Sequence, residues 1–433
     1  MQPKRELAVI WFGPIYGTGG YSSVSRAYIM GLIKAGVKIK VLNYGDNEKD
    51  KLSTKVRKTL ESHEGTVIRN YDKKILVLHQ TPDNASGITF SGIDYTICLT
   101  IFETDKIPKN WVGICNSKRI NEVWVPTKFN IETFSESGVK KEKLRILHYG
   151  LDASKYKPKS LSQNKVFRIL YIADLTERKN IPLLIKAFNE EFCGKENIEL
   201  FLHITSNNVL AIEEFVKINA EQIESSHITL STQKLSEKKI HELIKSADLY
   251  ISVDRANGWG MPCMEAMAMG GLAATVNWSG STEFMDKTNS LLLNPNRLER
   301  ASPESTLTSP LYIGHKWAHV EIGEIRRVLR YAHANYNKTK DIRKKALNDI
   351  KTRFSSDIVT KEMIRALNSV DVSNKAGCDM VLKPYSKNKI GLNAVRNNFR
   401  FNLNYLLEYH SARFFLRTIN SIKTKAIKIL SPK

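Results

Sequence analysis

The chain has 433 residues, a length that predicts two domains with an appendage. Its net charge of +22, from 66 Lys+Arg against 44 Asp+Glu, favours an anionic partner: phosphate, nucleic acid or an acidic membrane face. The five cysteines are odd in number and form no Cys-x-x-Cys pair, which argues against a zinc site or a disulfide framework and indicates reduced thiols in the cytoplasm. Because no run of 18 apolar residues and no signal-peptide pattern occurs, we expect no membrane span.

The first part of the chain alternates apolar runs with helical patterns. Residues 7–12 are typical of a buried parallel strand, residues 13–20 form a glycine-rich loop, and a helical pattern at 21–35 precedes a strand at 37–44. Further strands are predicted at 75–79, 95–102, 122–125 and 144–148, with a helix at 127–137. This alternation predicts an α/β fold.

A polar segment rich in Lys and Ser, residues 152–163, predicts a linker, and the alternation starts again after it. Strands are predicted at 166–173, 198–205, 227–231, 247–253 and 272–276, with helices between them at 181–192, 209–223, 236–246 and 262–269. We therefore predict two Rossmann-like, doubly wound domains that face a cleft, with ligands bound at the carboxyl ends of the strands.

The end of the chain changes in character. Residues 317–370 are mostly helical by pattern, whereas residues 381–433 contain 11 Lys or Arg, interleaved aromatic residues and a single acid, Glu408. A basic, aromatic extension of this kind is expected to be helical, and it fits either binding to an anionic membrane surface or a solvated helix packed on the first domain; the sequence leaves both open. Nucleic acid has no recognition motif in its support.

The glycine-rich loop at 13–20 is the first candidate for ligand binding. Gly19 and Gly20 stand directly before a helix, where close-approaching backbone amides favour an anion. Ser22 replaces the last glycine of a dinucleotide fingerprint, and no Walker loop is present. The loop is therefore either a phosphate contact or a plain tight turn.

Two further loops follow strands of the second domain. In the loop at 174–180, the planar fork of Arg178 and the compact charge of Lys179 can bind a diphosphate, although adjacent surface cations are more often solvated. In the segment at 254–267, two glycines make a tight turn before a helix that carries Glu265 in its first turn. That carboxylate either caps free amides or accepts hydrogen bonds from ribose hydroxyls.

The letters N-G-W-G-M-P-C-M-E-A at 257–266 resemble the motif E-G-F-G-L-P-x-x-E-A of the retaining GT-B glycosyltransferases, in particular family 4, the glycosyl transferases of group 1. The resemblance spans residues 5–370 and includes V-P-T at 125–127, Y-G-L-D at 149–152, the Arg178–Lys179 pair, S-G-S-T-E at 279–283 and L-L-L-N-P at 291–295. It implies an acceptor-side domain at 1–160, a nucleotide-sugar domain at 161–350, a crossover helix at 351–375 and a basic tail at 376–433.

The resemblance also implies an activity. The chain would transfer a hexose from a UDP- or GDP-sugar, with retention, to a saccharide or lipid-linked acceptor in polysaccharide or glycan assembly. It would work in the cytoplasm, at most peripherally on the inner membrane face. Because no Asp-x-Asp occurs, we expect neither a metal nor any other cofactor.

Residue roles follow from the same resemblance. The diphosphate would lie against Arg178 and Lys179, and the ribose against Glu265. The donor sugar's hydroxyls would be held by Asn257, Gly258, Gly260 and Met261. Gly19 and Gly20 would let the backbone of the first domain close over the phosphates.

Two departures from the family pattern bear on activity. The family's first Glu is replaced by the uncharged Asn257, so either Asp254 or Glu283 compensates or the activity is altered or lost. Where the family often has a His near the donor sugar, this chain has Glu103, so Glu103 and His79, at the end of the preceding strand, are the acceptor-side catalytic candidates.

Three rival functions remain. An epimerase or phosphorylase on the same architecture would convert the donor without an added acceptor. A non-catalytic sugar-nucleotide-binding subunit is favoured by Asn257. A NAD-dependent oxidoreductase needs the fingerprint that Ser22 interrupts.

Overall fold

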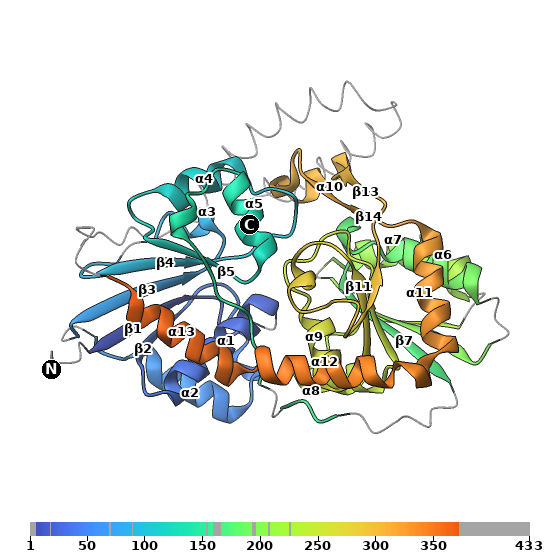
Figure 1. Ribbon diagram of the computed structural model, residues 1–433, viewed down its shortest axis with the longest axis horizontal. Coiled ribbons are helices and arrows are strands. Elements are labelled where there is room, and N and C mark those ends of the chain that lie inside the picture. Colours follow the sequence, from blue (N-terminus) through green and yellow to red (C-terminus); the bar gives the residue numbers. More distant parts are fainter. Residues whose placement is uncertain are drawn as a thin grey trace, which may run out of the picture. The chain divides into compact units, whose positions relative to one another are not determined.

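The first sheet contains six parallel strands in the order β2-β1-β3-β4-β5-β6 (Figure 1). The computed structural model describes residues 6–17, 19–68, 71–88, 90–152, 155–158, 166–192, 196–206, 208–224 and 227–371. The strands are β1 Leu7–Gly13, β2 Lys38–Asn43, β3 Lys73–His79, β4 Tyr95–Leu99, β5 Glu122–Val125 and β6 Leu144–Ile146. The helices are α1 Gly20–Lys34, α2 Thr54–Glu64, α3 Pro82–Ala85, α4 Lys109–Asn116 and α5 Lys128–Glu136.

The second sheet also has six parallel strands, in the order β12-β11-β10-β7-β8-β9. Its strands are β7 Phe167–Asp174, β8 Ile198–Thr205, β9 Ile228–Ser231, β10 Leu249–Ser252, β11 Leu272–Val276 and β12 Leu291–Leu293. Its helices are α6 Ile181–Glu191, α7 Val209–Glu224, α8 Glu237–Ser246 and α9 Met261–Ala268. Two Rossmann-like sheets are therefore present, and the predicted fold class is confirmed.

Strand order places a switch point in each sheet. In the first sheet the order reverses beside β1, between β1 and β3, and in the second it reverses between β7 and β10. Doubly wound sheets bind their ligands at the carboxyl ends of the strands next to such a point. The loops predicted to bind the donor follow β1, β7 and β10, so the topology alone singles them out.

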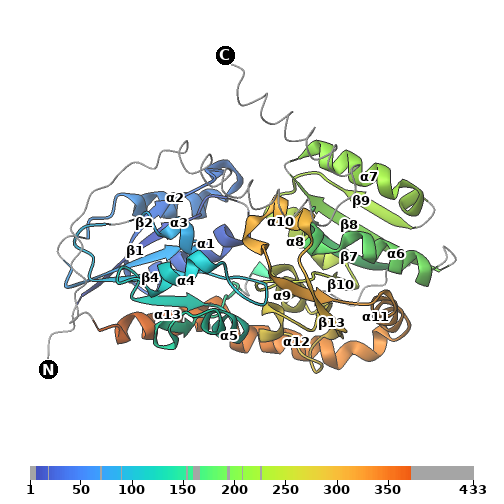
Figure 2. The same cartoon turned by 90° about the horizontal axis from the view of Figure 1, so that it is seen from above.

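Three long helices end the described chain: α11 Ile322–Ala334, α12 Lys340–Arg353 and α13 Ser356–Ser369. Helix α12 packs on α9, beside the second sheet, whereas α13 returns to pack on α1 (Figures 1 and 2). The approach of α13 to α1 is close, because a Cβ at Gly31 would lie 2.1 Å from the Thr360 hydroxyl oxygen.

Two features differ from the predicted elements. A hairpin joins β13 Arg297–Arg300 to β14 Lys316–His319, and β14 occupies the start of the segment at 317–370 predicted to be mostly helical. Between these strands, Ala301–Ile313 belong to a separate compact unit that carries α10 Pro303–Thr308. The strand predicted at 95–102 ends at Leu99, after which the chain leaves the sheet.

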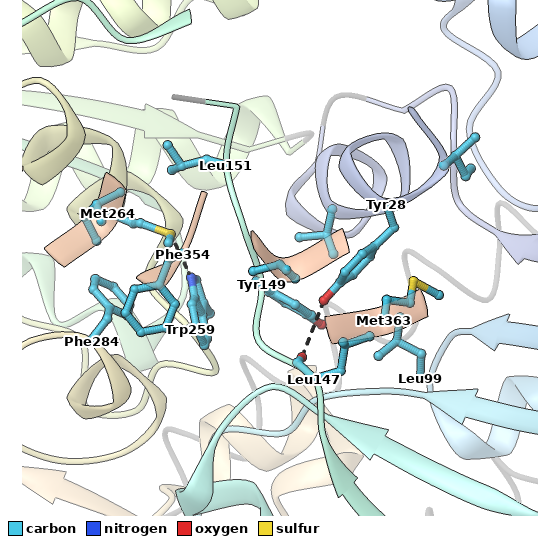
Figure 3. Packing of buried hydrophobic residues seen from close by; sticks show 14 of the residues in the cluster. Tyr28, Leu99, Leu147, Tyr149, Leu151, Trp259, Met264, Phe284, Phe354 and Met363 are labelled. Carbon is cyan, nitrogen blue, oxygen red and sulfur yellow. Dashed lines mark hydrogen bonds between the residues drawn. The ribbon is translucent and has the colours of Figure 1, made fainter. Parts of the chain in front are cut away.

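A core of aromatic and aliphatic side chains runs between residues of both sheets and α13 (Figure 3). The Trp259 ring lies 5.4 Å from Tyr149, 5.1 Å from Phe284 and 5.8 Å from Phe354. Trp259 also donates its indole N–H to the Met264 sulfur at 3.2 Å. Because Trp259 lies within the predicted donor loop, this packing anchors the loop to the apolar core.

Candidate active site

The turn after β7 carries the two predicted diphosphate-binding cations. Arg178 and Lys179 lie in a short 3-10 helix, Glu177–Lys179, which ends at Asn180 in the left-handed region with φ of 53°. A non-glycine residue is strained there, and Asn tolerates the conformation better than most. The turn thereby reverses directly into α6 and leaves both cations at the carboxyl end of β7.

The turn after β10 lies next to the turn after β7, because β7 and β10 are paired strands. Gly260 has φ of 97°, a conformation for which only glycine is free of strain, and Pro262 lies in the first turn of α9. The amide of Arg255 donates to the carbonyl of Arg178 at 2.8 Å, and the Arg178 guanidinium donates to the carbonyl of Ala256 at 2.7 Å. Two predicted donor-binding loops are thus joined by hydrogen bonds.

A buried carboxylate lies beneath both cations. Asp254 is 3% exposed and accepts from the Lys179 ammonium at 2.6 Å, while the Arg178 guanidinium lies 3.8 Å away. Burial raises the pKa of Asp254, but the charges of Lys179 and Arg178 outweigh it and hold that pKa below its usual range. The carboxylate is therefore ionised at neutral pH.

The loop after β4 brings residues of the first sheet to the donor loops. Glu103 lies 3.5 Å from Arg178, and its carbonyl accepts from the Ser279 hydroxyl at 2.7 Å. A Cβ at Gly258 would lie 2.8 Å from the Ile101 Cδ1, so the Ile101 side chain packs closely on the Gly258 backbone. Glu103, the predicted acceptor-side residue, therefore lies beside Arg178, one of the two predicted diphosphate-binding cations.

Glu265 lies in α9 beyond its first turn, because the helix begins at Met261, so the predicted first-turn position is wrong. It accepts from the Tyr156 hydroxyl at 3.1 Å, and His241 lies 3.8 Å away. Tyr156 belongs to the segment that connects the two sheets, and its ring lies 4.8 Å from that of His241. These contacts place Glu265 between the linker and α8.

The remaining donor-loop residues act mainly through their backbones. The Asn257 carbonyl accepts from the Gly280 amide at 2.8 Å, and its amide donates to the Ser279 hydroxyl at 3.3 Å. Ser279 itself has φ of 71°, a strained conformation for serine. Met261 packs partly buried against the apolar core.

Gly19 and Gly20 lie at the start of α1, and a Cβ at either position would meet no atom within 4 Å. Gly19 is the N-cap of the helix and provides no side-chain cap. Packing does not require glycine here, so the two residues leave open backbone at a helix N-terminus, where partial positive charge favours anions.

His79 is the predicted residue that the structure sets apart. It is fully buried, its ring stacks on Tyr21 with centroids 4.9 Å apart, and its Nδ1 lies 2.7 Å from the Ser25 hydroxyl. Burial lowers the pKa of His79 to about 3, so the imidazole is neutral at physiological pH. In this conformation the ring is part of the core and has no surface toward a ligand.

Residues 152–302 match the family model of Glycosyl transferases group 1. This range includes the turn that carries Arg178 and Lys179 and the turn after β10 that forms the donor loop. The resemblance to group 1 glycosyltransferases is confirmed. No curated protein matches the chain in sequence.

Several solved structures share the fold. HepE from Anabaena, solved with UDP-glucose, superposes with a TM-score of 0.62 at 15% identity over 84% of this chain and 100% of its own. Sucrose-phosphate synthase from Thermosynechococcus elongatus gives 0.59 at 12% identity, over 83% and 98%. A glycosyltransferase from Rickettsia africae gives 0.58 at 12% identity, over 84% and 98%. At such identities the likeness shows the GT-B fold alone.

Four residues of this candidate site were not among the predicted site residues. Tyr156 and His241 flank Glu265, and Ser279 joins the donor loop to Glu103. Tyr171 lies beneath the cations, where its hydroxyl donates to Asp254. Ser279 opens the S-G-S-T-E segment that resembles the family, but no local motif marks the other three, because each acts through contacts between segments far apart in sequence.

Among the described residues, no helix is long and apolar enough to cross a membrane, and no group of three or more His, Cys, Asp or Glu side chains is arranged to hold a metal ion. Within the same ranges Cys98, Cys115 and Cys263 are buried free thiols. The basic tail at 376–433 lies outside the described residues, and the expected cleft stays a prediction.

A partly buried histidine links the donor side to the first sheet. His148, which follows β6, lies 3.1 Å from Glu283 and 3.5 Å from Glu362 of α13, while Glu283 also accepts from the Lys128 amide at 2.7 Å. Burial lowers the pKa of His148, but the two carboxylates outweigh it and raise that pKa. The pKa of Glu283 is lowered, because its hydrogen bonds to His148 and Lys128 outweigh burial.

We expect His148→Asn to destabilise the protein more at pH 6 than at pH 9. A raised pKa means that the stabilisation is fully present below the unfolded value, near 6.5, and is lost as pH rises through the folded value. The penalty at pH 6 should be about 1 kcal/mol, because Glu362 is partly exposed and screened. Chemical unfolding of both proteins at the two pH values measures it, and equal penalties would contradict the ion-pair assignment.

Proposed function

We propose that this chain is a glycosyltransferase that moves a sugar from a nucleotide-diphosphate sugar to an acceptor, with retention of anomeric configuration. The observation that supports this most directly is the joining of the Arg178–Lys179 turn to the donor loop at the switch point between β7 and β10. The family-model match covers this same segment. Two cations held at the carboxyl ends of paired parallel strands are suited to a diphosphate.

The donor contacts that we propose follow from this arrangement. Arg178 and Lys179 bind the diphosphate, and their charge stabilises the leaving group as the sugar–phosphate bond breaks. Glu265 accepts from the ribose hydroxyls, since its carboxylate lies in α9 beside the Tyr156 hydroxyl. The donor base is that of UDP or GDP, and the UDP-glucose complex of HepE favours UDP.

The donor sugar lies, in this proposal, against the loop at 257–261. Asn257 offers an amide to its hydroxyls, and the backbone of Gly258, Gly260 and Met261 lines the same turn. Gly19 and Gly20 present open backbone to the phosphates from the first sheet. With two cations at the leaving group, the reaction needs no metal ion and no other cofactor.

Glu103 is the residue that we propose on the acceptor side. Its carboxylate lies 3.5 Å from Arg178, whereas His79 is fully buried and neutral. We propose a saccharide or lipid-linked acceptor, as in polysaccharide assembly in the cytoplasm. The basic residues at 381–433 suit binding to an anionic membrane face, which liposome co-sedimentation of the chain with and without them can test.

One alternative draws on a specific residue. Asn257 stands where the family has Glu, which favours a non-catalytic subunit that binds the donor without turnover. Such a subunit would stay inactive after Asn257→Glu, whereas a transferase would keep or gain activity. An epimerase or phosphorylase would convert the donor without any acceptor.

We expect a UDP-sugar to raise the melting temperature of the wild type, because a ligand that binds only the native state stabilises it by about 2.7 kcal/mol at a hundred times its Kd. A thermal-shift series with UDP-, GDP- and ADP-sugars identifies the base, and NADH serves as the control for a dinucleotide enzyme. Lys179→Ala should lose most of the shift. If no nucleotide sugar shifts the wild type, or if NADH alone does, the proposal fails.

A further inference from the structure

Asp254 is a charged side chain at the switch point that the proposed donor contacts do not use. It follows β10 directly and is 3% exposed, which is rare for an ionised carboxylate. Buried charges are costly unless they are paired and hydrogen-bonded. The neighbours of this carboxylate therefore indicate why it is kept there.

Each oxygen of Asp254 has a separate partner. Oδ2 accepts from the Lys179 ammonium at 2.6 Å, and Oδ1 accepts from the hydroxyl of Tyr171. The Tyr171 hydroxyl also lies 2.8 Å from the carbonyl of Lys179, so Tyr171 contacts both the backbone of Lys179 and the carboxylate that holds its side chain. Tyr171 is buried in β7, which fixes this arrangement to the sheet.

The geometry leaves Lys179 able to bind a ligand. An ammonium group carries three N–H donors, and the contact with Asp254 uses one. Lysine has a long, flexible side chain, so an ammonium held at one point loses less conformational freedom when a phosphate arrives. The same carboxylate lies 3.8 Å from the Arg178 guanidinium and partly balances its positive charge as well.

We propose that Asp254 is a positioning residue that, with Tyr171, holds the Lys179 ammonium in place for the donor's diphosphate. This inference rests on the proposed function, because it takes Lys179 to contact that diphosphate. The opposite role is competition, in which Asp254 occupies Lys179 and weakens donor binding. The two roles predict changes of opposite sign when the carboxylate is removed.

The test is a double-mutant cycle on UDP binding, measured by isothermal titration calorimetry for the wild type, Asp254→Asn, Lys179→Ala and the double variant. We expect Asp254→Asn to weaken UDP binding about tenfold, since hydrogen bonds to charged groups are worth that much or more. Because Asp254 acts through Lys179, the double variant should bind no more weakly than Lys179→Ala. Tyr171→Phe, which removes only the hydroxyl, should give a smaller loss of the same sign.

Asp174→Asn is the matched control. Asp174 is an exposed carboxylate of the same turn, 4.0 Å from both cations, and its removal should change UDP affinity by less than twofold. Melting temperatures of all variants show whether each is folded. Unchanged or tighter UDP binding by folded Asp254→Asn, or fully multiplicative losses in the double variant, overturns the positioning role. Failure of the wild type to bind either UDP or GDP instead rejects the proposed function, and this inference with it.

Discussion

Replacement of Arg178 by alanine is expected to lower turnover about a hundredfold, which corresponds to ~3 kcal/mol of transition-state stabilisation. Negative charge builds up on the diphosphate as its bond to the sugar breaks, so a cation at that point acts more strongly in the transition state than in the ground state. The guanidinium lies at the carboxyl end of β7 beside Glu103 and Asp254, in the place where the leaving group is proposed to bind. Turnover is measured as UDP release from a verified donor.

Arg178 also has a structural contact, and the experiment must separate the two effects. Its guanidinium donates to the Ala256 carbonyl, so the alanine variant loses one hydrogen bond that supports the donor loop. That loss should cost about 1 kcal/mol in unfolding free energy, far less than the loss in turnover. Lys186→Ala, an exposed cation of the following helix α6, is the control for removal of positive charge. Full activity of folded Arg178→Ala would refute the diphosphate assignment.

The alternation of strands and helices in both domains was predictable because the strands are buried on both faces of their sheets. Continuous apolar runs such as those of β1 and β10 stand out against the polar helices between them. The helix α2 was not predicted, since only Leu60 of its eleven residues is buried and its pattern carries little apolar signal. The strand β14 was missed because only its two central residues are buried, whereas the equally short β5 has three buried residues in a row.

Local sequence also located half of the candidate site. The cations of one turn and the glycines of another each follow an apolar strand, and strand order brings those two turns together. What sequence could not supply were contacts across long separations. The hydrogen bond between Ser279 and Glu103 joins residues 176 positions apart, and Tyr156 reaches Glu265 from the linker. The burial of His79 was likewise hidden, because it depends on Tyr21 and Ser25 from another element.

The donor loop depends on one glycine that has no chemical role. Gly280 follows the strained Ser279, and its amide donates to the Asn257 carbonyl at 2.8 Å. A Cβ at Gly280 would lie 1.7 Å from the Gly258 carbonyl oxygen and 2.8 Å from that of Asn257. Both obstacles are backbone atoms, so no side-chain rotation can relieve the contact.

We therefore expect Gly280→Ala to destabilise the protein by about 3 kcal/mol, at the upper end of overpacking penalties, and to weaken UDP-sugar binding at temperatures where the variant is still folded. The affinity should fall because a displaced 257–260 loop also disturbs the Ala256 carbonyl that holds Arg178. Gly323→Ala is the matched control, since a Cβ there meets no atom within 4 Å and alanine favours the helix α11 by up to about 1 kcal/mol. Chemical unfolding measures the stability of both variants, and calorimetry measures their affinity for a UDP-sugar. If Gly280→Ala keeps the stability and the affinity of the wild type, the loop does not support donor binding in this way.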